Sequence, residues 1–229
     1  IRGGAPNENV YYLDGIEIVN INHFATQGSA GGPVGMINVS FIDDVTLSTG
    51  GFNARYDNPL SGVLQFNQRS GNPEKHQGNF RLGASEVALT LDGPINKKTT
   101  YMVSARRSYL QLLFKLINLP FLPSYWDFQY KVNHKINDKN ELSFIGLGSI
   151  DNFAFNPPNS ADFDTEEAYL ENLSILDGIP KSAQWTATNG VVWKHNLGKG
   201  YVNVALSQNY LDNKATKYRD NKEGVDSLL

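Results

Sequence analysis

Apolar and polar residues alternate along most of the second half of the chain. In residues 125–137, Trp126 and Phe128 fall on one face of an extended segment. Asp127 and Gln129 fall on the other. Because successive side chains of a strand point to opposite faces, a period of two predicts a strand. The same pattern predicts seven strands, at residues 77–84, 87–95, 100–109, 125–137, 140–152, 184–197 and 200–214.

The connections between these strands differ in length. Short turns are expected at residues 95–99, 137–140 and 197–200, whereas residues 110–124 and 153–183 form long connections. An outer-membrane β-barrel has tight turns on its periplasmic side and long loops on its outer side, with lipid against its apolar face. The pattern therefore favours a membrane barrel. A soluble antiparallel sandwich, whose strands alternate in the same way, is the alternative.

The first 74 residues have a different character, with many glycine and turn residues between short apolar runs. Asp14-Gly15 predicts a hairpin between residues 10–13 and 16–19. Ser40 to Asp44 predict one helical turn, and the alternation in residues 61–67 predicts another strand. We therefore expect a small α/β module at residues 1–74, followed by barrel strands at residues 75–229.

Composition narrows the class of protein. No apolar run reaches the ~18 residues of a membrane-spanning helix, so any crossing must use strands in a closed barrel. Leu110, Leu113 and Ile117 have the spacing of a short amphipathic helix in a long connection. The net charge of −3 and the scattered basic residues argue against nucleic acid, and the absence of cysteine excludes disulfides and thiolate metal sites.

Seven short motifs follow one another in the first half of the chain. They are Arg2-Gly3-Gly4-Ala5-Pro6-Asn7-Glu8-Asn9, Tyr12-Leu13-Asp14-Gly15-Ile16, Gly50-Gly51-Phe52-Asn53-Ala54-Arg55-Tyr56, Leu60-Ser61-Gly62-Val63-Leu64, Arg69-Ser70-Gly71-Asn72, Leu91-Asp92-Gly93-Pro94-Ile95 and Arg106-Arg107-Ser108-Tyr109. In this order they resemble the TonB-dependent outer-membrane receptors. The likeness is greatest to the subgroup that carries a carboxypeptidase-regulatory-like domain before the plug.

The resemblance implies a mainly β fold, with about seven strands of a transmembrane antiparallel β-barrel after an N-terminal α/β plug portion. It covers the later plug, to about residue 74, and the first of 22 barrel strands. The TonB-contacting segment is expected before Ile1, and the remaining strands after Leu229. The implied location is the outer membrane of a Gram-negative bacterium. The implied partners are outer-membrane lipid, the TonB protein and a surface lipoprotein or another membrane complex.

Two segments are candidates for contact with a ligand. Residues 20–35 are rich in glycine and polar side chains, and residues 153–181 form the longest outer connection. Exposed loops held by a rigid scaffold commonly carry binding residues. The candidate substrate-binding residues are Asn22, His23, Phe24, Gln27, Phe155 and Tyr169.

The chain has no pattern that predicts catalysis, a cofactor or a resident metal. Asp162, Asp164 and Glu166 have the spacing of the first three ligands of a calcium loop, but Glu167 occupies the position that requires glycine. A solvated outer loop is the better interpretation. No nucleophile elbow, phosphate-binding loop or metal-ligand histidine spacing occurs.

Arg106 and Arg107 end the third strand, and alternation sends their side chains to opposite faces. We expect one to face the lumen and pair with plug carboxylates. The other would extend toward the membrane interface.

Three functions fit the sequence. The first is import of a scarce nutrient, such as a siderophore, vitamin, glycan or peptide, through a plugged barrel. The second is a non-transporting relative that plugs or scaffolds another outer-membrane complex. The third is a soluble β-sandwich binding module.

Overall fold

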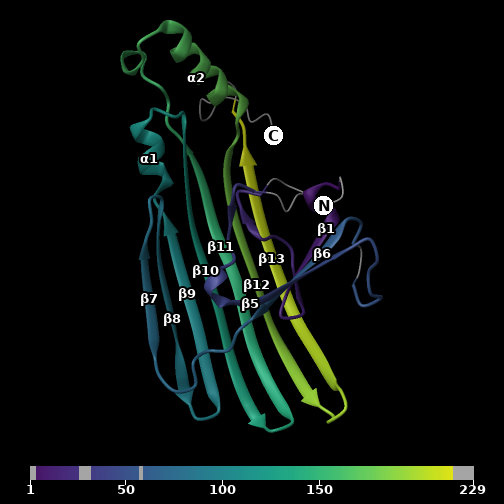
Figure 1. The fold of residues 1–229 in the computed structure, drawn as a ribbon. Helices are drawn as coiled ribbons and strands as arrows, with labels where there is room; N and C mark the ends of the chain where they lie inside the picture. The colour runs from purple at the N-terminus through teal and green to yellow at the C-terminus, as the bar shows by residue number, and fades with distance from the viewer. Residues whose placement is uncertain (1–3, 26–31, 57–58, 219–229) are drawn as a thin grey trace.

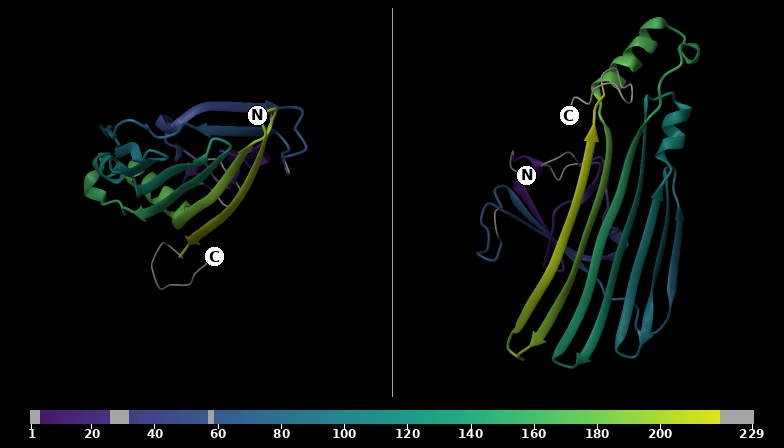
Figure 2. Two further views of the ribbon diagram at one scale, coloured as in Figure 1. Left: turned by 90° about the horizontal axis from the view of Figure 1, so that it is seen from below. Right: turned by 180° about the vertical axis from the view of Figure 1, so that it is seen from behind.

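The computed structural model describes residues 4–25, 32–56 and 59–218 of the 229-residue chain. A curved seven-stranded sheet and a smaller four-stranded sheet dominate the fold, and the smaller sheet lies against one face of the larger (Figures 1 and 2). We call the seven-stranded sheet the wall, and the described residues up to 74 the plug.

The wall contains every strand that the alternation predicts. Its strands are β7 (Gln77–Leu82), β8 (Glu86–Asn96), β9 (Thr99–Ser108), β10 (Phe121–Asn137), β11 (Asn140–Phe155), β12 (Lys181–Asn196) and β13 (Tyr201–Thr216). Each pairs antiparallel with its neighbours in sequence, which gives the order β13-β12-β11-β10-β9-β8-β7. Within the described residues the sheet is open, with β7 and β13 as its edges.

The two ends of the wall differ as the connection lengths predict. Tight turns join β8 to β9, β10 to β11 and β12 to β13 at one end (Figure 1). The other end carries α1 (Leu110–Leu116), η3 (Ser160–Asp162) and α2 (Glu166–Gly178). The predicted helix near residue 110 is confirmed, and α2 lies where the sequence predicted only a loop. No helix in the described ranges is long and apolar enough to span a membrane.

From β8 to β12 the wall buries its polar face and leaves its apolar face open, whereas the edge strands β7 and β13 are exposed on both faces. On β10, Asp127 and Gln129 are 3% and 1% exposed, whereas Trp126 and Phe128 are 41% and 45% exposed. Arg107 lies on the open face, with its guanidinium carbon 5.1 Å from the centre of the Trp126 ring. A soluble sandwich does the reverse, because it buries its apolar faces against each other. The arrangement contradicts the sandwich alternative and suits a surface in contact with lipid.

The plug sheet has the order β2-β1-β6-β5. Its strands are β1 (Asn9–Leu13), β2 (Ile16–Ile18), β5 (Ile42–Thr49) and β6 (Gly62–Gln68), and a separate two-stranded ribbon consists of β3 (Asn22–His23) and β4 (Val34–Gly35). The predicted hairpin is confirmed: Asp14 and Gly15 have φ of 49° and 86°, as the tight turn requires. β1 also pairs in parallel with β6.

The helical segments of the plug are two short 3-10 turns, η1 (Pro6–Glu8) and η2 (Val39–Phe41). The sequence predicted a helical turn from Ser40 to Asp44, and this position is wrong. The side chain of Asn38 accepts the N–H of Ser40 at 3.0 Å and caps an earlier turn. The chain then enters β5 at Ile42.

An apolar core joins the plug to the wall. Its buried members are Tyr11, Leu13, Ile16, Ile18 and Met36 of the plug and Ile145 and Leu147 of β11. Gly190 on β12 faces this core, and a Cβ atom at that position would collide with the side chain of Ile16. The missing side chain therefore allows the β1–β2 hairpin to lie directly on the wall.

Candidate functional site

His23, the last residue of β3, is fully buried between plug and wall. Its Nδ1 lies 2.6 Å from Oδ1 of Asp151 on β11, and its Nε2 lies 2.9 Å from Oδ2 of Asp127 on β10. A neutral imidazole has one N–H group, whereas the imidazolium ion has two and can donate to both carboxylates. The geometry therefore favours the protonated ring. We call these three residues the histidine clamp.

Two opposing effects determine the pKa of His23. Burial lowers the pKa, because removal from water penalises the charged ring. Hydrogen bonds to Asp127 and Asp151, together with the charges of these carboxylates, raise it by more. The pKa of His23 therefore lies above its ordinary value of 6.5, and this favours the charged ring at neutral pH.

Arg106 on β9 extends the clamp along the wall. Its Nε donates to Oδ2 of Asp127 at 2.6 Å, and its Nη1 donates to Oε2 of Glu86 at 3.2 Å. Its Nη2 donates to the carbonyl oxygen of Gly35 in the plug at 2.5 Å. The inward orientation agrees with the sequence prediction, but the predicted pairing with plug carboxylates is wrong. The plug strand at this point, β4, has no acidic residue, so the carboxylates come from the wall.

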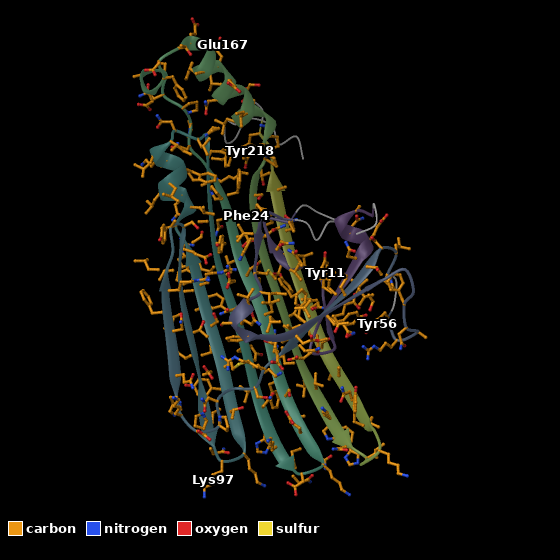
Figure 3. The ribbon with its side chains drawn as sticks, in the orientation of Figure 1. Tyr11, Phe24, Tyr56, Lys97, Glu167 and Tyr218 are labelled. Atoms are coloured by element: carbon orange, nitrogen blue, oxygen red, sulfur yellow. The ribbon has the colours of Figure 1, made fainter. Side chains whose placement is uncertain are left out.

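Phe24, labelled in Figure 3, follows the clamp histidine. Its backbone is strained. Its φ of 54° lies in the left-handed region, which costs a non-glycine residue about 1–3 kcal/mol. Its N–H donates to Oδ2 of Asp151 at 3.0 Å and holds this conformation. Its ring meets those of Tyr125 and Phe153 edge-on, with centroid distances of 6.1 and 6.4 Å.

A run of aromatic rings leads from Phe24 to α1. Phe153 stacks on Phe121 at 5.1 Å, and Phe121 meets Phe114 edge-on at 5.5 Å. All four rings are partly exposed and lie toward the end of the wall with the long connections. Such rings offer flat apolar surface to a ligand. We call Phe24, Phe153, Phe121 and Phe114 the aromatic run.

A second polar cluster fastens the plug sheet to β10. Nζ of Lys131 lies 2.8 Å from Oδ2 of Asp14 and donates to the carbonyl oxygen of Gln68 at 2.8 Å. The side chain of Gln129 donates to Oε1 of Gln68 and accepts the N–H of Asn38, both at 2.8 Å. The plug thus supplies the partners that these buried wall side chains need.

The structure brings three of the predicted ligand residues together. Asn22, His23 and Phe24 lie at the interface with the wall, where His23 is buried and Phe24 is half-buried. Gln27 lies outside the described residues. His23 is buried and therefore holds the plug to the wall through its two carboxylate partners.

The other two predicted residues lie at the outer end. Phe155 ends β11 in register with Phe121, beside the aromatic run. Tyr169 is on α2, where its ring lies 6.0 Å from that of Phe163. The acidic residues near it are exposed, and within the described ranges no three His, Asp or Glu side chains are arranged to hold a metal ion.

Sequence reasoning missed the acidic partners of the clamp. Asp127, Asp151 and Glu86 lie on the inward face of the wall. The sequence feature that could have identified these three residues is their position on the strand face opposite the aromatic side chains. Buried carboxylates are nearly always paired, so each predicted a basic partner.

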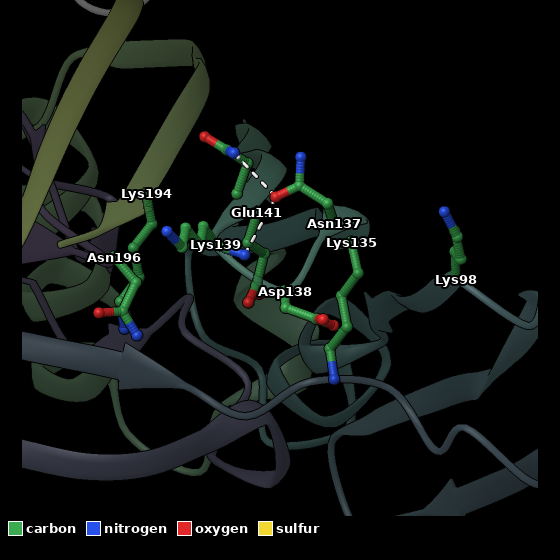
Figure 4. A pocket seen from close by; sticks show the side chains of 9 residues that line it. Lys98, Lys135, Asn137, Asp138, Lys139, Glu141, Lys194 and Asn196 are labelled. Carbon is green, nitrogen blue, oxygen red and sulfur yellow. Dashed lines mark hydrogen bonds between the residues drawn. The ribbon is translucent and has the colours of Figure 1, made fainter. Parts of the chain in front are cut away.

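A hollow of about 620 Å³ opens at the end of the wall with the tight turns (Figure 4). Its charged lining residues are Lys98, Lys135, Lys139, Lys194, Asp138 and Glu141. The excess of positive charge favours anions, but the lysines are exposed and salt screens such charges. The clamp and the aromatic run together are therefore the candidate site.

Solved structures of bacterial receptors have the same arrangement of plug and wall. The ferric enterobactin receptor PfeA of Pseudomonas aeruginosa, in complex with enterobactin, matches 95% of the chain at 15% identity with a TM-score of 0.61. The siderophore receptors PirA of Pseudomonas aeruginosa and PiuA of Acinetobacter baumannii each match 94% of the chain, at 11% and 9% identity, with TM-scores of 0.58 and 0.59. The chain shares their fold.

The match spans about a third of each receptor: 35% of PfeA and PirA and 30% of PiuA. The expected fold class, a mainly β chain with a partial antiparallel barrel wall and a plug, is confirmed. No protein-family model and no curated protein matches the chain.

Proposed function

We propose that the chain is the later plug and first wall strands of an outer-membrane receptor that imports a scarce nutrient with energy delivered through TonB. The observation that carries this proposal is the wall itself, which turns apolar side chains outward and closes its polar face with a separate module. A plugged membrane barrel requires this arrangement. The shared fold with siderophore receptors supports it.

In this proposal residues 1–74 belong to the plug and residues 75–229 to the wall. The motifs that resemble the carboxypeptidase-regulatory-like subgroup support an additional domain before the plug in the full-length protein. Cargo passes without covalent chemistry, so no catalytic group or cofactor is needed. A surface lipoprotein has no support in the fold and is not part of the proposal.

The site would work in two parts. The aromatic run lies toward the outer end and would hold cargo by stacking. The histidine clamp holds the plug closed beneath it. Hydrogen bonds and ion pairs contribute little net stability where water can replace the partners. Water that enters the interface can take over the partners of the clamp, whereas the apolar core would still hold the β1–β2 hairpin against β11.

Uptake by cells tests the proposal. Cells with the full-length protein should take up radioiron from a ferric siderophore, or a labelled vitamin, glycan or peptide, and should lose this uptake when the gene for the protein or for TonB is deleted. Phe24→Ala with Phe153→Ala should weaken cargo binding about tenfold, because each aromatic contact contributes about 0.5–1.5 kcal/mol.

Phe128→Ala is the matched control for the aromatic variants, because this ring lies on the open face of the wall and should not affect binding. Unchanged uptake of all four cargo classes in the deletion strain would contradict the proposal. A receptor-like protein that scaffolds another complex would then be the better interpretation.

A further inference from the structure

One row of residues with three polar side chains crosses the open apolar face of the wall. Strand register pairs Tyr130 with Gly146, Gly146 with Asn189, and Asn189 with Gln208. These four residues therefore lie at one level across four strands, and we call them the midline row. Asn189 and Gln208 are both exposed.

Within its own strand, the Asn189 member of the midline row lies halfway between two tryptophans. On β12, Asn189 is equally far from Trp185 and Trp193. At a rise of ~3.3 Å per residue, each tryptophan is ~13 Å away along the strand. Aromatic girdles border the apolar band of a membrane barrel. The row would therefore lie near the middle of the lipid, where a polar group without a partner is costly.

The carboxamide of Asn189 is only partly satisfied. Its Oδ1 accepts the hydroxyl of Tyr130 at 3.0 Å. Nothing in the described part of the chain accepts a hydrogen bond from its Nδ2, although both neighbouring strands are in place. The exposed N–H₂ group is therefore open to a partner from outside these strands.

A shallow groove of about 220 Å³ runs beside Asn189. Gly146, Gly148 and Ala187 form its floor, and Phe128 and Trp185 line its sides. Small residues allow close approach of another protein surface within a membrane, and polar groups there supply interchain hydrogen bonds. The groove and the amide together have the features of such a contact.

We propose that this groove and Asn189 form a contact between two copies of the full-length protein. Identical chains lie at the same depth in a membrane, so a two-fold axis along the membrane normal brings Asn189 of one copy to Asn189 of the other. A carboxamide both donates and accepts, so the two amides satisfy each other. The aromatic side chains of each copy then cover the groove of the other. The inference rests on the proposed function, because it requires lipid around the wall.

Cysteine cross-linking in native outer membranes tests this contact. The chain contains no cysteine, so Ala187→Cys places one thiol beside Asn189 and leaves the amide intact. A disulfide requires Cα atoms about 4.4–6.8 Å apart. Mild oxidation should give a covalent dimer of the full-length protein that reducing agent reverses.

Two variants make the test specific. Leu89→Cys lies on the same face and in the same register row as Ala187, but four strands away, and should give no dimer. Asn189→Leu in the Ala187→Cys background should lower the yield of dimer about tenfold, as expected for the loss of intramembrane hydrogen bonds. Leucine suits a lipid-facing position, so this variant should insert normally.

The outcomes separate this inference from the proposed function. If the protein inserts in the outer membrane but Ala187→Cys gives no dimer, lipid fills the groove and the inference is wrong, while the import proposal stands. Equal yields from Ala187→Cys and Leu89→Cys would indicate random collision and also overturn it. Failure of the unmodified protein to fractionate with the outer membrane would overturn both.

Discussion

At the scale of single residues, His23 places a titratable ring between two buried carboxylates, Asp127 and Asp151. Its folded pKa is raised above 6.5. The charged ring therefore stabilises plug–wall contact fully below about pH 6.5, and this contribution is lost as the pH rises through the raised value. The groups that face the ring from the neighbouring strands are the two carboxylates, Arg106 and Tyr125.

We expect the backbone amides of residues 20–25 in the full-length protein to exchange hydrogen faster as the pH rises through the pKa of His23, after correction for intrinsic exchange. Loss of the ring charge leaves Asp151 buried without a cation. His23→Gln should therefore lower the free energy of local opening by about 3 kcal/mol and remove the pH step. Hydrogen exchange read by mass spectrometry measures both effects. An identical pH step in wild type and variant would assign the titration to another group.

The sequence selected Asn22, His23 and Phe24 as ligand candidates, which stays a prediction, but it did not indicate that His23 is buried. Glycine and polar residues around this segment indicated an exposed loop. The partners of His23 lie 104 and 128 residues further along the chain. Only the register of β10 and β11 brings both carboxylates to one point. Sequence periodicity identifies the polar face of a strand, but it does not identify the segment that covers this face.

At the scale of elements, the wall strands were predictable because alternation and tight turns agree along each hairpin. The largest difference is the start of β10, which the sequence placed at residue 125 and the structure places at Phe121. Pro120 precedes this segment and Pro123 lies in it, and proline disfavours the interior of a strand. Pairing of Phe121 with Phe155 keeps this segment extended despite the prolines. The start of α2 had a usable signal, since Thr165 caps a turn that begins with two glutamates.

The fit of the β1–β2 hairpin on β12 depends on Gly190. We expect Gly190→Val to lower the free energy that holds the hairpin on the wall by about 1–3 kcal/mol, because the new side chain overlaps Ile16. The urea midpoint for exposure of the hairpin in the full-length protein measures this loss. Combining Gly190→Val with Ile16→Ala should restore part of it.

Gly51→Val is the matched control for this prediction, because a Cβ atom there meets nothing. It should leave the midpoint unchanged. A loss of equal size at both glycines would show that valine acts through the backbone and not through contact with Ile16.

At the scale of the whole molecule, the wall has its apolar side outward, and neighbouring residues on one strand therefore meet different solvents. Phe144 lies on the open face of β11, whereas Ser143 lies on the face toward the plug. Arginine on the lipid side near the middle of a barrel costs about 2–4 kcal/mol. On the lumen side, water and polar groups solvate it.

We expect Phe144→Arg to reduce the folding stability of the full-length protein in lipid vesicles by this amount, and Ser143→Arg to change it little. Urea titration followed by the heat-dependent mobility of the folded barrel on gels measures both. A larger loss for Ser143→Arg than for Phe144→Arg would reverse the assignment of the two faces.

The parallel pairing of β1 with β6 determines how the plug responds to mechanical load. Residues Asn9 to Leu13 run beside Gly62 to Phe66 in the same direction. Just after β6, Arg69 is fastened to the wall through Asp92 at 3.1 Å. A pull on the chain before Asn9, resisted at Arg69, draws the two strands past each other lengthwise. All the hydrogen bonds between them then bear the force together, so the sheet resists as a unit until it yields in one step.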